Sequence, residues 1–231
     1  MKIHGMGWNP SPFDPKDFTL GDFIPQFPMS LSLIRSKYWD FPVDSLNQDD
    51  TPHCVGFSIA DFGINLPTYT SYTNEDGHDF YYKCKIKEGH PGEENGSNLR
   101  AAAKVMKDAG RINAYAFANT VDSIKWWLLN KGPMIAGTVW TTDMYETNEN
   151  FVIKPTGSRV GGHAYLLNGY TSDGYISIQN SWGNDWGLNG KAYIHEDDLA
   201  QLLRQGGEVI TAVELPLGWS SKKSRHPRRC R

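Results

Sequence analysis

The sequence has few cysteines. Its 231 residues include only Cys54, Cys84 and Cys230, which lie far apart along the chain. A disulfide framework needs more cysteines, and a cysteine-ligated zinc site needs them at closer spacing, so we expect neither. The composition fits a reducing compartment. No residue pattern predicts a metal or another cofactor.

The sequence also lacks long apolar runs. None approaches the ~20 residues that a membrane-spanning helix needs, and residues 1–15 lack the apolar core of a secretory signal. We therefore expect no membrane partner and no export by that route. The expected location is the cytoplasm or a virion.

The chain has little net charge. It carries 26 acidic and 23 basic residues, a formal net charge of −3, which gives no general reason to expect a nucleic-acid partner. Basic residues do cluster in the C-terminal tail, residues 216–231, where KKSRHPRRCR begins at Lys222. Two interpretations of this tail stay open: a solvated, disordered end, or an arm that binds a polyanion such as nucleic acid.

Residues 1–30 contain five prolines and little hydrophobic periodicity, which predicts an extended N-terminal arm rather than a folded unit. The aromatic residues of this arm disfavour full disorder, so we expect its rings to pack on the surface of the globular domain. That domain is predicted to span residues 31–215. Its helical part covers about 48–118 and its β part about 119–215.

Three helices are predicted before the strands begin. An apolar run at helical spacing predicts the first from Cys54 to Leu66, with Pro52 in its first turn. Ser97 is a candidate cap for the second, which ends at Gly110. The third covers residues 121–130.

From Pro133 onward, short apolar segments alternate with turn residues, which is typical of β-strands. Strands are predicted at residues 134–140, 164–170, 175–180, 191–195 and 209–215, with a short helix at 196–203. Helices followed by strands predict an α+β fold with two subdomains.

The segment from Gly161 to Gly190 carries the first chemical signal. Its two strands are joined by turn residues 171–174, which predicts a β-hairpin. The hairpin brings His163, at the start of one strand, close to Asn180, at the end of the next. A histidine oriented by a side-chain amide can act as a general base, which needs a nucleophile from which to take a proton.

Cys54 is the best candidate for that nucleophile. It begins a predicted helix, and the partial positive charge of a helix N-terminus lowers the pKa of a thiol. A neighbouring imidazolium would lower it further, so a reactive thiolate is expected at neutral pH. Gln48, six residues earlier, can offer its amide to an oxyanion together with the backbone N–H of Cys54.

These residues resemble the motifs of the papain-like cysteine peptidases. A glutamine stands six positions before a helix-leading cysteine, a histidine stands between glycine and alanine, and NSWGNDWGLNG begins at Asn180. The similarity spans residues 31–215 and is strongest between 161 and 194. It implies a papain-like fold in which a helical left subdomain and an antiparallel, barrel-like β subdomain enclose the active-site cleft.

The resemblance also implies a role for each matching residue. Cys54 would be the nucleophile, His163 the general base and acid, and Asn180 the residue that orients the imidazole. Gln48 would stabilise the oxyanion, and Trp182 would shield the bond between Asn180 and His163 from water. The implied reaction is hydrolysis of a peptide or protein substrate through an acyl-enzyme.

The substrate would bind in an extended conformation. Gly96 and Ser97 resemble the family's segment whose backbone pairs with the substrate, although Ser97 replaces an expected glycine. Gly162 and Trp182 are expected on the opposite side of the same site.

Several positions depart from the family pattern. Pro52 and His53 replace small residues, and Val55 stands where the family often has tryptophan. These changes alter the wall near the primary specificity site. His53 and the other histidines outside the motif, among them His4, are expected on the surface or in turns.

The arm is shorter than the family's usual helical prosegment, so any autoinhibition should take a different form. Its pattern GW…DPKDF is similar to short leaders of microbial relatives, which favours a prokaryotic or phage origin.

Two alternatives to peptide hydrolysis stay open. One is a thiol acyl-transferase (transpeptidase) of the same fold, which passes the acyl group to an amine. The other is a non-catalytic homologue that serves as a binding module or virion assembly protein.

Overall fold

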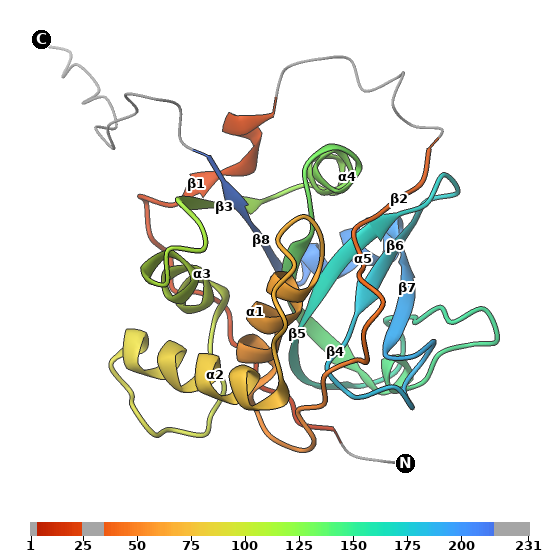
Figure 1. Ribbon diagram of the computed structural model, residues 1–231. Coiled ribbons are helices and arrows are strands. Elements are labelled where there is room, and N and C mark those ends of the chain that lie inside the picture. Colours follow the sequence, from red (N-terminus) through yellow and green to blue (C-terminus); the bar gives the residue numbers. More distant parts are fainter. Residues whose placement is uncertain (1–3, 25–34, 215–231) are drawn as a thin grey trace, which may run out of the picture.

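The computed structural model describes residues 4–24 and 35–214 (Figure 1). A helical layer and a twisted sheet lie side by side, with α1 between them. The helices of that layer are α1 (Cys54–Ile64), α2 (Asn74–Glu88) and α3 (Leu99–Asp108). The basic tail and Cys230 lie outside the described residues.

The sheet has the strand order β1-β3-β8-β4-β5-β6-β7, and β2 also pairs with β5. All pairs are antiparallel except β1 with β3, which are parallel. The strands are β1 (Phe18–Thr19), β2 (Lys37–Tyr38), β3 (Ala114–Ala118), β4 (Met134–Thr141), β5 (Arg159–Tyr170), β6 (Tyr175–Gln179), β7 (Lys191–His195) and β8 (Glu208–Val213).

The predicted α+β class is confirmed, but two details differ. The sheet is mixed and open rather than barrel-like, because the described residues form no pairing between β1 and β7 that would close it. In addition, β3 (Ala114–Ala118) lies within residues 48–118, the part that was expected to be helical. This segment is a strand that pairs with β8.

Local sequence explains where the helices begin. Thr73 and Asp76 form a reciprocal capping box at the start of α2, a helix that was not predicted from the sequence pattern. The cap of α3 is Asn98, whose side chain accepts from the Ala101 N–H, rather than Ser97. Pro52 precedes α1 instead of lying in its first turn, and Cys54 is the first helical residue.

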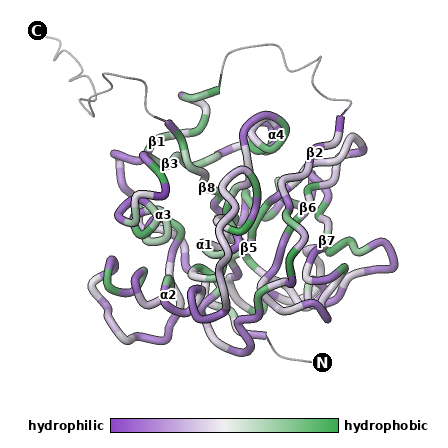
Figure 2. The backbone as a smooth tube through the Cα atoms, viewed as in Figure 1, coloured by the Kyte–Doolittle hydropathy of each residue, from purple (hydrophilic) through white to green (hydrophobic). Residues whose placement is uncertain are grey.

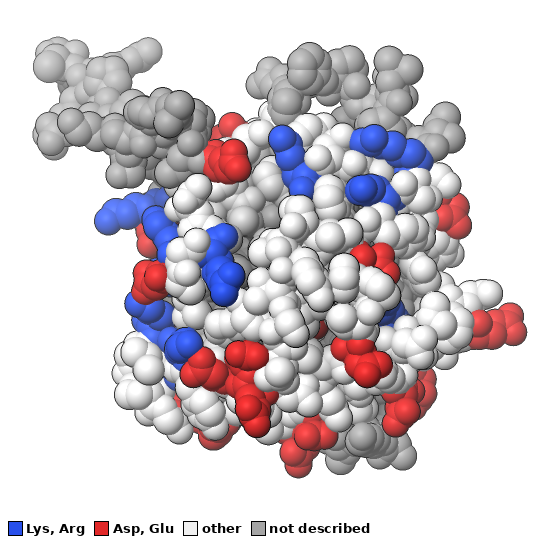
Figure 3. All heavy atoms as spheres, in the orientation of Figure 1, with Lys and Arg blue, Asp and Glu red and all other residues white. Residues whose placement is uncertain are grey.

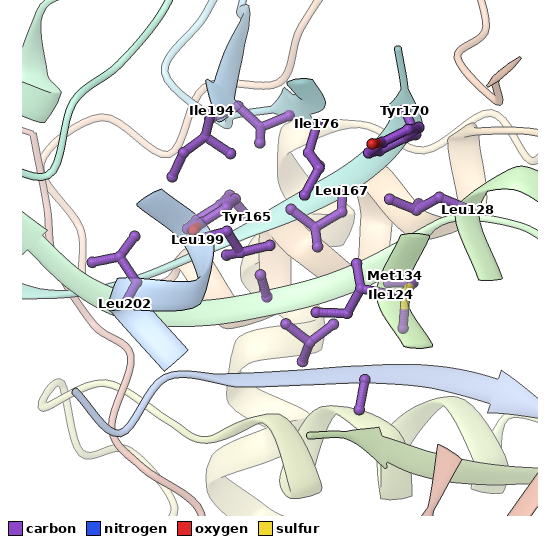
Figure 4. Close-up of a cluster of buried hydrophobic side chains, with 14 of the residues drawn as sticks. Ile124, Leu128, Met134, Tyr165, Leu167, Tyr170, Ile176, Ile194, Leu199 and Leu202 are labelled. Atoms are coloured by element: carbon purple, nitrogen blue, oxygen red, sulfur yellow. The ribbon is translucent and has the colours of Figure 1, made fainter. Parts of the chain in front are cut away.

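Two more helices cover the other face of the sheet. They are α4 (Val121–Asn130) and α5 (Glu196–Arg204), with short 3-10 turns at Leu20–Phe23 and Thr142–Tyr145. Strand β5 is buried on both faces, so its successive side chains enter different cores. Tyr165 and Leu167 face the core beneath α4 and α5 (Figure 4), whereas Ala164 and Leu166 face α1.

The hydropathy pattern follows these layers. Hydrophobic backbone runs through the central strands, and hydrophilic segments gather in the outer loops and along much of α2 (Figure 2). On the face seen in Figure 3, charges of both signs are present, with acidic groups toward the lower edge. None of the helices in the described part of the chain combines the length and apolar character that crossing a bilayer requires.

The N-terminal arm differs from its predicted form. It contains β1 and a 3-10 turn, and Leu20 is completely buried. Trp8 is also buried, at 4% exposure. The arm is therefore built into the fold: Trp8 is buried and Phe18 and Phe23 pack against a core cluster, whereas Phe13 is 91% exposed.

Gly56 permits the close packing of α1 on α2. A Cβ at this position would lie 2.3 Å from the Gly77 carbonyl oxygen and 2.4 Å from the Tyr81 nitrogen. We expect Gly56→Ala to lower the free energy of unfolding by about 1–3 kcal/mol, because backbone would have to move. Gly132→Ala, whose new Cβ would meet only Pro67 at 3.7 Å, should change it by less than about 0.5 kcal/mol. Urea denaturation measures both, and equal effects would contradict the packing argument.

Candidate active site

Cys54 lies at the N-terminus of α1, where the helix meets β5. Its side chain is completely buried. The backbone N–H of Ala164 donates to its Sγ across 3.4 Å. The thiol on the helix is thus held beside the residue that follows His163 on the strand.

His163 and Asn180 meet as the predicted hairpin requires. The Nε2 atom of His163 lies 2.8 Å from Oδ1 of Asn180, and both residues are fully buried. A carbonyl oxygen only accepts, so Nε2 carries the hydrogen and the neutral ring keeps its lone pair on Nδ1. No hydrogen-bond partner for this Nδ1 occurs among the described residues. The bond to Asn180 therefore selects the tautomer that a general base needs.

Aromatic rings enclose the imidazole. Trp182 lies against it with 4.7 Å between ring centroids, and Trp140 meets it edge-on at 4.9 Å. Both indoles are almost completely buried. Both rings pack against the buried His163. The shielding role of Trp182 stays a prediction, and Trp140 was expected only as core.

Gln48 lies close to the start of α1, the helix that begins with Cys54. Its Oε1 accepts from the Ser181 hydroxyl at 2.7 Å, which orients the amide. Its Nε2 donates to the carbonyl oxygens of Thr51, at 2.7 Å, and Gly5, at 3.2 Å. The amide predicted to bind an oxyanion thus already holds a carbonyl oxygen of the N-terminal arm.

The arm runs through the site between its two walls. The amides of Gly7 and Trp8 donate to the Gly162 carbonyl at 3.0 and 2.9 Å. On the other wall, Ser97 donates to the Gly7 carbonyl at 2.7 Å, and its own carbonyl accepts from Asn9 at 2.8 Å. The arm pairs with Ser97 in parallel. Residues 5–9 therefore use the backbone groups that were predicted to bind substrate.

Glycines make this passage narrow. A Cβ on Gly7 would lie 2.0 Å from the Pro52 carbonyl oxygen. A Cβ on Gly96, which has a φ of +82°, would lie 2.2 Å from the Gly7 carbonyl oxygen. A Cβ on Gly5 would lie 2.0 Å from the Thr51 carbonyl oxygen. Neither Gly5 nor Gly7 of the arm can carry a side chain in this position. Gly96 thus leaves room for the arm because it has no side chain, and Ser97 binds the arm through its backbone N–H and carbonyl.

The candidate catalytic groups are uncharged while the arm is paired with Gly162 and Ser97. Burial raises the pKa of the Cys54 thiol to about 12, an effect that backbone hydrogen bonds from Ala164 and Gly7 oppose. Burial also lowers the pKa of His163 to about 4, against the hydrogen bond to Asn180. The thiolate expected at neutral pH is therefore absent while the arm covers the site. Desolvation raises the pKa of the Cys54 thiol by more than the helix N-terminus lowers it.

Two histidines expected on the surface are buried. His4 of the arm stacks on Trp182 with 4.3 Å between centroids. His53, just before Cys54, stacks on Tyr81 at 3.8 Å, and its Nε2 lies 2.6 Å from a carboxylate oxygen of Glu94. Burial lowers the pKa of His53, and its contact with Glu94 opposes this shift. His53 is therefore a fixed part of the wall rather than a free surface group.

Comparison with known proteins identifies the family of this chain. The family model described as Papain family cysteine protease matches residues 57–204, a range that includes His163 and Asn180 but begins after Cys54. A cathepsin B-like cysteine proteinase 4 of Caenorhabditis elegans is 32% identical over 144 residues, which are 59% of this chain and 40% of that protein. A cathepsin B-like cysteine proteinase 3 of Ostertagia ostertagi is 32% identical over 92 residues, 38% of this chain and 52% of the relative. The chain thus spans about half or less of these relatives.

Solved structures show the same fold. Xylellain, a cysteine protease from Xylella fastidiosa, superimposes with a TM-score of 0.69 at 21% identity, covering 92% of this chain and 98% of that one. A proCathepsin B S9 from Trypanosoma congolense gives a TM-score of 0.55 at 13% identity, covering 91% and 86%. With the matched family model over most of the domain, these findings show that the chain belongs to the papain family of cysteine proteases.

Proposed function

We propose that this chain is a papain-type cysteine peptidase in which Cys54 is the nucleophile and His163 the general base and acid. The observation that carries the proposal is the bond from His163 Nε2 to Asn180, which leaves Nδ1 without a hydrogen-bond partner among the described residues. The position of Cys54 beside Ala164 supports it. The family assignment gives independent support for peptide-bond hydrolysis.

The proposed reaction has two stages. The thiol proton passes to His163 Nδ1 as Cys54 Sγ attacks the carbonyl carbon, and the resulting oxyanion accepts from the Gln48 amide and the Cys54 N–H. His163 then protonates the departing amine, which leaves an acyl-enzyme. Water, deprotonated by His163, releases the acid and restores the thiol.

The arm would act as a built-in inhibitor. Its backbone bonds to both walls of the cleft, and its Gly5 carbonyl accepts from the Gln48 amide. It also buries the site, which keeps the thiol and the imidazole neutral. Residues 4–9 must leave before an extended peptide can pair with Ser97 and Gly162. From Phe18 onward the arm belongs to the sheet and can stay in place.

Removal of the thiol tests the nucleophile. In a chain that also carries Gly7→Ala, which is expected to displace the arm, Cys54→Ala should lower kcat on a peptide-library digest by at least about 10³-fold, because the acyl-enzyme cannot form. Cys84→Ala is the matched control, since Cys84 is also a buried helical thiol and should retain activity. Loss of activity in both variants, or in neither, would contradict the assignment. Added amines that appear in the products instead of water would indicate an acyl-transferase.

A side chain at Gly7 should open the cleft. Gly7→Ala is expected to raise the iodoacetamide labelling rate of Cys54 at neutral pH by about tenfold or more, because the Cβ would clash with Pro52 and expel the arm. Gly21→Ala is the control in the same arm, since its Cβ would meet only Thr19 at 3.9 Å. Mass spectrometry locates the label, and equal labelling rates of Cys54 in both variants would contradict the inhibitory role of the arm.

The pH dependence of labelling should change in the same variant. A raised thiol pKa delays thiolate formation to higher pH, so labelling of Cys54 in the parent protein should rise only in strongly alkaline solution. In Gly7→Ala, solvent and the imidazolium stabilise the thiolate, so labelling should already be fast near pH 6 and should depend on His163. Identical pH profiles for parent and variant would contradict this account.

A further inference from the structure

The two walls of the cleft are built differently. Gly162 lies in β5, where pairing with β4 fixes its position. Ser97 lies in the α2–α3 loop, residues 91–98, which has no regular secondary structure apart from the bridge to Trp8 of the arm. When the arm leaves, that bridge is lost, so side-chain contacts must keep this loop in place.

Two buried side chains of α2 bind the α2–α3 loop. The Tyr81 hydroxyl donates to the Glu93 carbonyl at 2.8 Å and accepts from the Gly96 N–H at 3.2 Å. The Lys85 side chain is also buried, and its ammonium group donates to the Gly96 carbonyl at 3.0 Å. These bonds attach the loop to α2, but they do not connect it to the helix that begins with Cys54.

His53 makes that second connection. It directly precedes Cys54, and its Nε2 lies 2.6 Å from a carboxylate oxygen of Glu94 in the loop. An ionised carboxylate only accepts, so Nε2 donates, and Nδ1 of the neutral ring accepts from Nδ1 of His78 on α2 at 2.7 Å. Tyr81 stacks on the face of the same ring. The imidazole is therefore fixed at both nitrogens and at one face, and it is only 2% exposed.

We propose that His53 and Glu94 are positioning residues, which hold the α2–α3 loop where an extended peptide can pair with Ser97 while its carbonyl meets Cys54. This inference rests on the proposed peptidase function. Neither side chain acts on the reacting atoms; their bond acts through the loop backbone, because Ser97 follows Glu94 by three residues. A looser loop weakens the binding of substrate and transition state alike, which raises KM and leaves kcat nearly unchanged.

The test uses the full chain carrying Gly7→Ala, to which Glu94→Ala or Glu94→Gln is added. Glutamine keeps an oxygen that accepts from His53, whereas alanine does not. For an extended peptide we expect Glu94→Ala to raise KM about tenfold and Glu94→Gln to keep it within about threefold of the parent value. Asp79→Ala is the control, since it removes a carboxylate of α2 whose ion pair with Lys83 is exposed, and KM should not change.

A second substrate separates positioning from folding. Nitrophenyl acetate can acylate Cys54 but offers no peptide backbone to pair with Ser97, so its hydrolysis should be the same with and without Glu94→Ala. His53→Phe keeps a ring against Tyr81 but cannot donate to Glu94. It should raise the peptide KM as much as Glu94→Ala does, and the double variant should show no further rise.

The outcomes distinguish this inference from the proposed function. An unchanged peptide KM in Glu94→Ala, an equal rise in Glu94→Gln, or a matching loss of activity on the ester would overturn the inference and leave the peptidase intact. Failure of the Gly7→Ala chain to cut any peptide, although Cys54 labels rapidly, would overturn the proposed function and this inference together.

Discussion

The backbone of residues 5–9 joins the two walls of the cleft. Gly162 belongs to the strand that carries the candidate base, whereas Ser97 lies on the helical side, and the arm bonds to both. Cys54 and His163 come from different layers, so their environment depends on what lies between those walls. With the arm in place both groups are buried and neutral, so the proposed chemistry requires that a substrate replace this segment.

A buried polar network holds the two layers together beneath the site. Gln179 on β6 donates to Asp61 on α1 at 3.0 Å and accepts from Asn65 at 3.0 Å. Asn168 on β5 joins the same group. Burial raises the pKa of Asp61 well above its usual value, and the hydrogen bond from Gln179 opposes this shift. Since Gln179 precedes Asn180, the network connects the orienting residue to the helix that carries Cys54, which pre-organises the site.

Side-chain patterns explain which parts of this arrangement were predictable. The hairpin that joins His163 and Asn180 has apolar strands and clear turn residues, and the helix at Cys54 has regular apolar spacing. Helix α2 escaped prediction because its residues are largely polar and Gly77 interrupts its buried face. The path of the arm was also missed, because backbone groups carry its bonds and only Gly5 and Gly7 mark it in the sequence. Glu208 on β8 accepts from the backbone N–H and the hydroxyl of Ser11, a contact across 197 residues of chain that no local pattern indicates.

Amide hydrogen exchange at residues 7–9 tests the central claim most directly. If the arm occupies the substrate's place, the amides of Gly7, Trp8 and Asn9 should be protected in the free protein, because each donates to a wall of the cleft. Acylation of Cys54 by a peptidyl inhibitor should abolish that protection while the amides of β5 stay protected. Unprotected arm amides in the free protein, or protection that survives acylation of Cys54, would contradict the account.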